Sequence, residues 1–282
     1  MPINVTELTK TGIYQATAPL AIVARDMDEI DALRLSRKKR RNHFFILALV
    51  ALVLGLIVMT VGMTVTRFAP LAGVPLLIAF GGLVWVGTIA NRGILAAPER
   101  TNLVKGLVAM LAADAHSKAP VSIWISLDQK GTTLCEEPWL AKKKGKERRA
   151  SCEWLRLEAP MLDGTGFSQT ITDFFRDRSY VNPRGKSKKK RRTTSEVVQK
   201  YRFPAEIYGD PARFPEEEVG TLINLPHSAT LRGLRVSEKA LTARVQVKVV
   251  EADLLQSCTM LSLGVYRILN LARRVNLRGT AQ

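Results

Sequence analysis

The sequence predicts a membrane α-helical hairpin, made of two transmembrane helices, followed by a cytoplasmic α+β domain. Two apolar runs without a charged residue, 44–65 and 69–90, are each long enough to cross a hydrocarbon core of about 30 Å as a helix. After residue 119, apolar residues recur with the two-residue period of β-strands. The end of the chain returns to a helical period. The expected segments are an N-terminal segment, the hairpin, a connecting helix and the α+β domain: 1–43, 44–90, 91–118 and 119–282.

Only Thr66, Arg67 and Phe68 separate the two apolar runs. So short a loop predicts a tight helical hairpin, because the bilayer interior forces backbone groups to hydrogen-bond within each segment. The alternative is a pair of buried helices in a large soluble core, although such helices rarely lack polar residues on every face. Small residues in both runs would let the two helices, or two copies of the chain, pack closely.

Basic residues flank the first run asymmetrically. Six Lys and Arg residues lie between 34 and 41, whereas the connecting loop carries only Arg67. The positive-inside bias then places both termini in the cytoplasm. We expect an integral membrane protein, of a bacterial inner membrane, in which a basic helix begins near Asp26. Its juxtamembrane anchor consists of Arg37, Lys38, Lys39, Arg40 and Arg41.

The α+β domain is expected to begin after a helix that starts at Pro98 and ends before Pro120. Alternating apolar residues and turn signals then predict an antiparallel meander of about seven strands. The last two strands form a hairpin around 237–240. The predicted strands are 121–127, 132–140, 152–158, 167–180, 194–208, 231–236 and 241–250.

A long C-terminal helix is predicted from Asp253, with apolar residues spaced alternately by four and three positions. The stripe favours docking across the sheet, because Leu255, Leu263 and Leu269 widen it; a dimerising coiled coil is the alternative. The stripe consists of Leu254, Cys258, Leu261, Val265, Ile268, Ala272 and Val275. A strand meander closed by a C-terminal helix is similar to the pleckstrin-homology-like fold, and this resemblance of fold implies no function.

The net charge of +17 is concentrated in three short clusters, at 34–41, 142–149 and 184–192. These clusters together carry +18, so the rest of the chain is close to neutral. This distribution predicts local electrostatic contacts with an anionic partner.

No catalytic, metal or cofactor motif appears in the sequence. His43, His116 and His227 do not share metal-ligand spacing, and the three cysteines form no CxxC pair. We therefore predict no cofactor and no enzymatic activity. A membrane-associated enzyme with an unrecognised site remains the second alternative.

In a meander, loops alternate between the two ends of the sheet, so the two later basic clusters should form loops at the same end. We expect a membrane-anchored interaction or scaffold protein that contacts anionic lipid head groups or an acidic protein through these loops. Non-specific nucleic-acid binding is the first alternative; solvated hairpin tips without function are another. Homo-oligomers through the hairpin or the C-terminal helix are also considered. The candidate binding residues are Lys142, Lys143, Lys144, Lys146, Arg148, Arg149, Arg184, Lys186, Lys188, Lys189, Lys190, Arg191 and Arg192.

Overall fold

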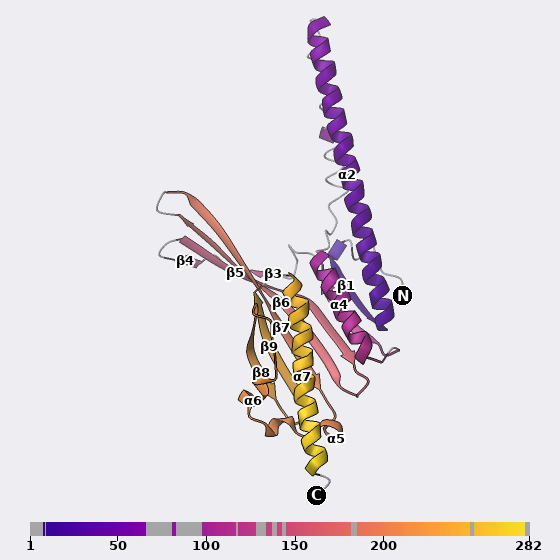
Figure 1. Cartoon of the computed structure of the whole chain (residues 1–282). Helices are drawn as coiled ribbons and strands as arrows, with labels where there is room; N and C mark the ends of the chain where they lie inside the picture. The colour runs from indigo at the N-terminus through magenta and orange to yellow at the C-terminus, as the bar shows by residue number, and fades with distance from the viewer. Residues whose placement is uncertain are drawn as a thin grey trace. The chain divides into compact units, whose positions relative to one another are not determined.

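The structure is a computed structural model, and its elements are drawn in Figure 1. The chain forms two compact units, residues 1–27 with 96–282 and residues 28–95. The first unit holds the sheet and the C-terminal helix. The described residues are 8, 10–65, 81–82, 98–116, 118–127, 134–136, 140–142, 145–181, 185–248 and 251–279.

One antiparallel sheet organises the first unit. Its main path has seven strands in the order β1-β2-β5-β6-β7-β9-β8, and two short strands, β3 and β4, pair with β5 beside this path. The strands are β1 (Ile13–Ala18), β2 (Val121–Ser126), β3 (Leu134–Glu136), β4 (Leu140–Lys142), β5 (Gly145–Pro160), β6 (Gly166–Val181), β7 (Ser187–Arg202), β8 (Ala229–Val236) and β9 (Ala240–Lys248).

The strand order departs from the predicted meander at both ends. β1 comes from a segment without a clear sequence signal, and it pairs along its whole length with β2. β9 lies between β7 and β8, and every second residue of β9 is buried, including Leu241, Val245 and Val247. In β8 only Leu234 is buried, which suits an edge strand.

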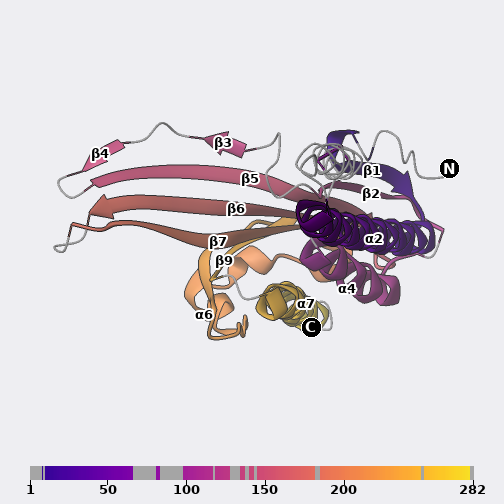
Figure 2. The same cartoon turned by 90° about the horizontal axis from the view of Figure 1, so that it is seen from above.

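Two long helices of the first unit cover one face of the sheet, which we call the helix-covered face (Figure 2). These are α4 (Pro98–Asp114) and α7 (Glu251–Gly279), and Gly106 of α4 allows Leu255 of α7 to approach closely. The predicted α7 stripe is buried against the sheet from Leu254 to Ala272, whereas Val275 is exposed. The other face, the open face, carries no helix among the described residues. Short helical turns follow β7: α5 (Ala205–Tyr208), η1 (Pro211–Arg213) and α6 (Glu216–Thr221).

The N-terminal helix, α2 (Leu20–Val65), begins before the predicted start. Asp26 is not its cap but lies inside it, with a buried carboxylate that accepts a hydrogen bond of 2.8 Å from Tyr14 Oη. The predicted helix start near Asp26 is therefore wrong, because this carboxylate binds Tyr14 of β1 and does not cap the helix. Burial and this hydrogen bond raise the pKa of Tyr14 well above its ordinary value.

The predicted transmembrane hairpin is wrong. Among the described residues, no helix combines the length and the apolar character that a bilayer crossing requires. Residues 44–65 are the C-terminal part of α2, whose N-terminal part carries eleven charged residues. Of the run 69–90, only Gly81 and Gly82 lie in the described part of the chain. The prediction counted charge-free length and treated each run as a separate helix.

The expected location depended on that hairpin. The predictions of an integral membrane protein, of a bacterial inner membrane and of cytoplasmic termini on one side of it are therefore wrong as well. The five residues predicted as a juxtamembrane anchor all lie within α2. Lys38, Lys39 and Arg40 are exposed there.

Candidate functional site: a basic β arm

Three strands of the sheet continue past the part that the helices cover and form a projecting arm (Figure 2). We define the arm as residues 145–151 of β5, 174–181 of β6 and 187–194 of β7. Its strands stay paired throughout, from Lys146 opposite Ser179 to Val181 opposite Ser187. β3 and β4 pair along the outer side of β5.

The structure places both later basic clusters on this arm, as strands rather than as the predicted loops. Residues 145–149 belong to β5 and residues 187–192 belong to β7, with β6 between them. The side chain of Lys142, and all of Lys143, Lys144 and Arg184, lie outside the described residues. The cluster residues meet across β6 because β5 and β7 each pair with it along the arm.

Sequence reasoning missed two cations of the arm, Arg176 and Arg178 on β6. Both lie in the middle of the arm, where they face residues of β5 and β7. The search for clusters of net positive charge did not identify Arg176 and Arg178, because the nearby Asp173 and Asp177 bring the local net charge to zero. The signal that could have found them is the alternation of Arg176 and Arg178 within a predicted strand.

The two faces of the arm differ in charge. Cross-strand partners share a face, so Arg149, Arg176 and Arg192 form one row across the open face. The next row consists of Glu147, Arg178 and Lys190. A third row consists of Tyr180 and Lys188. Six cations and one carboxylate therefore give this face of the arm a net charge of +5.

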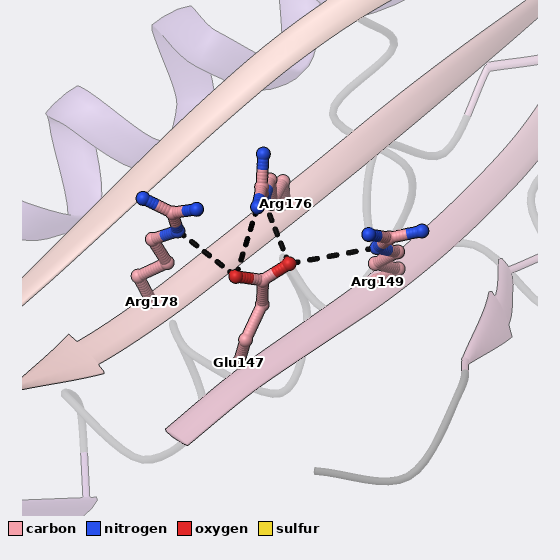
Figure 3. A network of polar contacts seen from close by, with 4 residues as sticks. All are labelled: Glu147, Arg149, Arg176 and Arg178. Atoms are coloured by element: carbon pink, nitrogen blue, oxygen red, sulfur yellow. Dashed lines mark hydrogen bonds and ion pairs between the residues drawn. The ribbon is translucent and has the colours of Figure 1, made fainter. Parts of the chain in front are cut away.

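A single carboxylate organises three arginines of that face (Figure 3). The side chain of Glu147 is only 3% exposed, and it accepts hydrogen bonds of 2.8 and 3.0 Å from Arg176. Arg178 Nε donates to Oε2 at 2.9 Å, and Arg149 Nε lies 3.5 Å from Oε1. The arginine side chains stay 37–59% exposed. The carboxylate therefore fixes guanidinium groups that still face water.

The opposite face of the arm carries less charge, because Lys146, Arg148, Lys189 and Arg191 against Asp177 give it a net charge of +3. Asp177 accepts two hydrogen bonds from Arg191, at 2.7 and 2.8 Å, and one from Arg148 at 3.2 Å. The hydrogen bond with Arg191 and the two neighbouring positive charges lower the pKa of Asp177 to about 2, although partial burial opposes the shift. The Arg191 guanidinium also lies 5.5 Å from the ring centroid of Phe175.

The Asp177 contacts predict that acid weakens the protein. Because the pKa of this carboxyl is lower in the folded protein than in the unfolded chain, its contribution to stability is full above about pH 4 and disappears as the pH falls toward 2. Asp177→Asn should therefore show a shallower loss of stability over this range than the native protein. Urea unfolding at stepped pH measures both curves, and parallel curves would contradict the assignment.

A buried ion pair lies at the root of the arm. The Arg100 side chain, 6% exposed, donates to Ser126 O at 2.7 Å and to Asp173 Oδ2 at 3.3 Å. Ser195 Oγ donates to Asp173 Oδ1 at 2.5 Å. The guanidinium also lies 4.9 Å from the ring centroid of Trp154. Arg100 thus links α4 to β2 and β6 where the arm leaves the helix-packed sheet.

The described residues offer little for other chemistry. No group of three or more His, Cys, Asp and Glu among them could hold a metal ion. Cys258 is fully buried, and this burial raises the pKa of its thiol to about 12, so it is a poor nucleophile. A shallow hollow of about 320 Å³ on the open face is lined by Ser122, Glu158, Lys200 and Arg202 among others.

Comparison of the chain with protein families, with curated proteins and with solved structures gave no match.

Proposed function

We propose that this protein is a non-catalytic binding protein whose arm holds an anionic partner. The observation that carries the proposal is the open face of the arm, where three cross-strand rows bring six cations and one carboxylate together. The nearly neutral remainder of the chain supports the same conclusion, because it confines the attraction to a few places.

Glu147 holds neighbouring arginine side chains in place, and this supports a role of the arm in binding rather than a merely solvated charged surface. Arg176 and Arg178 are fixed by this carboxylate while their side chains remain partly exposed. A partner that contacts them orders fewer side chains on binding, which lowers the entropic cost of the complex. Arginine also offers two parallel N–H groups to a carboxylate or phosphate.

One observation favours nucleic acid as a second candidate. Phe174 lies on the open face of the arm and is 41% exposed, in the strand that carries Arg176. Tyr180 lies on the same face, opposite Lys188. Aromatic side chains among cations can stack on the bases of single strands, so an oligonucleotide belongs in any binding test.

Replacing Lys188, Lys190 and Arg192 by Gln should weaken binding of a polyanion at least tenfold and reduce its salt dependence, since counterion release scales with the cations involved. These side chains are exposed, and no described carboxylate lies within ion-pair distance of them. The probes are a poly-glutamate peptide, a single-stranded oligonucleotide, and anionic and neutral lipid vesicles. Fluorescence anisotropy and vesicle co-sedimentation at low and high salt measure the binding.

A matched control variant loses the same number of positive charges at positions outside the arm. Arg235, Lys239 and Arg267 are exposed on β8, on the β8–β9 turn and on α7, and their replacement by Gln also removes three charges. This control should bind the probes as the native protein does. The proposal fails if no polyanion binds at low salt, or if the arm variant and the control lose affinity equally.

A further inference from the structure

Within the described ranges, the arm part of β7 has a strand partner on one side only. β6 pairs with β7 along its whole length, from Arg202 to Ser187, whereas β9 pairs with it only from Thr194 to Arg202. Among the described residues, no strand lies beside the other edge of 187–193 (Figure 2). Roughly every second residue of this edge therefore directs its backbone N–H and C=O outward.

The other edge of the arm, formed by β5, does have strand partners. The outer side of β5 is covered by β4 near its start and by β3 further along. A long bare edge is a template for another strand, so natural sheets cover such edges or place lysines on them. The edge of β7 pairs with no strand of the described part of the chain, and it carries Lys and Arg at every position from 188 to 192.

Strand alternation distributes these cations over both faces. Lys188, Lys190 and Arg192 lie on the open face, while Lys189 and Arg191 lie on the opposite face. The like charges repel the same edge of a second copy. They attract an incoming strand that carries carboxylates, because oppositely charged residues on paired strands stabilise each other.

From this edge we infer that an extended, acidic peptide segment adds to β7 as a further strand along 187–193. The inference rests on the proposed function, because the same cations would attract any polyanion. An acidic peptide fits better than nucleic acid or lipid because it can both donate to the outward C=O groups and accept from the outward N–H groups. A phosphate group, which lacks N–H donors, satisfies only half of these.

The experiment uses the full chain and a synthetic peptide of about eight residues, a length that matches the edge, with alternating Glu and Thr. Backbone amide hydrogen exchange of β7 is measured with and without saturating peptide. We expect exchange of the outward amides within 187–193 to slow at least tenfold, whereas the edge strand β8 is unchanged. A second peptide of equal charge is N-methylated at every other residue, so that it cannot extend the ladder, and should bind at least tenfold more weakly.

The outcomes separate the inference from the proposed function. If both peptides bind equally, lose affinity in the Lys188, Lys190 and Arg192 variant and leave the β7 amides unprotected, the arm binds anions but not by strand addition. Binding of only the oligonucleotide or only the vesicles also overturns the inference while the proposed function stands. If none of the probes binds, both fail.

Discussion

Replacing Arg100 by Met should lower the free energy of unfolding by about 3–5 kcal/mol, because it removes one partner of a buried ion pair and leaves the other charge without compensation. Asp173, whose side chain is 15% exposed, would keep only its hydrogen bond from Ser195 Oγ among those described here, and Ser126 O would lose its donor. The loss of the cation–π contact with Trp154 acts in the same direction. Urea unfolding followed by circular dichroism measures the change.

The control for this substitution is Arg156→Met. Arg156 also forms an ion pair with a carboxylate, at 2.7 Å from Glu153, but the two side chains are 59% and 36% exposed. Exposed pairs contribute about 0–1 kcal/mol, so this variant should unfold almost as the native protein does. Equal destabilisation by the two substitutions would show that burial of Arg100 is not what makes its ion pair matter.

Much of the sheet could be predicted because its core strands carry a local signal. In β9 the buried residues Leu241, Ala243, Val245 and Val247 alternate with polar ones, and this pattern can be read from consecutive positions. The buried stripe of α7 and the start of α4 at Pro98 are local signals of the same kind. The order of the strands is a matter of long-range pairing, so the place of β9 between β7 and β8 could not be read in this way.

The strands of the arm were not predicted, and the reason is again that they depend on long-range pairing. Beyond the helices, the strands bury little on either face, so residues 187–192 are polar at every position and lack the period of two. The sequence therefore resembled a charged loop. Only pairing with β6 shows that Arg192 lies beside Arg176, sixteen positions away along the chain. The basic clusters themselves were visible as charge, but the rows that they form were not.

Replacing Glu147 by Gln should loosen the arm while leaving the helix-packed sheet intact. The carboxylate accepts hydrogen bonds from Arg176 and Arg178 and forms an ion pair with Arg149, and without its charge these three guanidinium groups repel one another. Hydrogen bonds to charged groups contribute about 1.5–3 kcal/mol each, and the exposure of the arginines reduces what is lost here to about 2–3 kcal/mol in all. Because the arm lies past the part of the sheet that the helices cover, we expect the loss as local opening (Figure 2).

Amide hydrogen exchange tests this local effect directly. A loss of about 2–3 kcal/mol corresponds to an acceleration of roughly 30- to 150-fold, expected for the paired amides of 146–149 and 176–178. The amides of Ile171 and Val197, in the buried part of β6 and β7, should exchange as before. Glu196→Gln is the control, since Glu196 forms a long ion pair of 3.8 Å with the exposed Arg244 and its replacement should change exchange little. Unchanged exchange in the arm of the Glu147 variant would mean that backbone pairing alone holds the three arginines in their rows, and that the open face needs no carboxylate to be ordered.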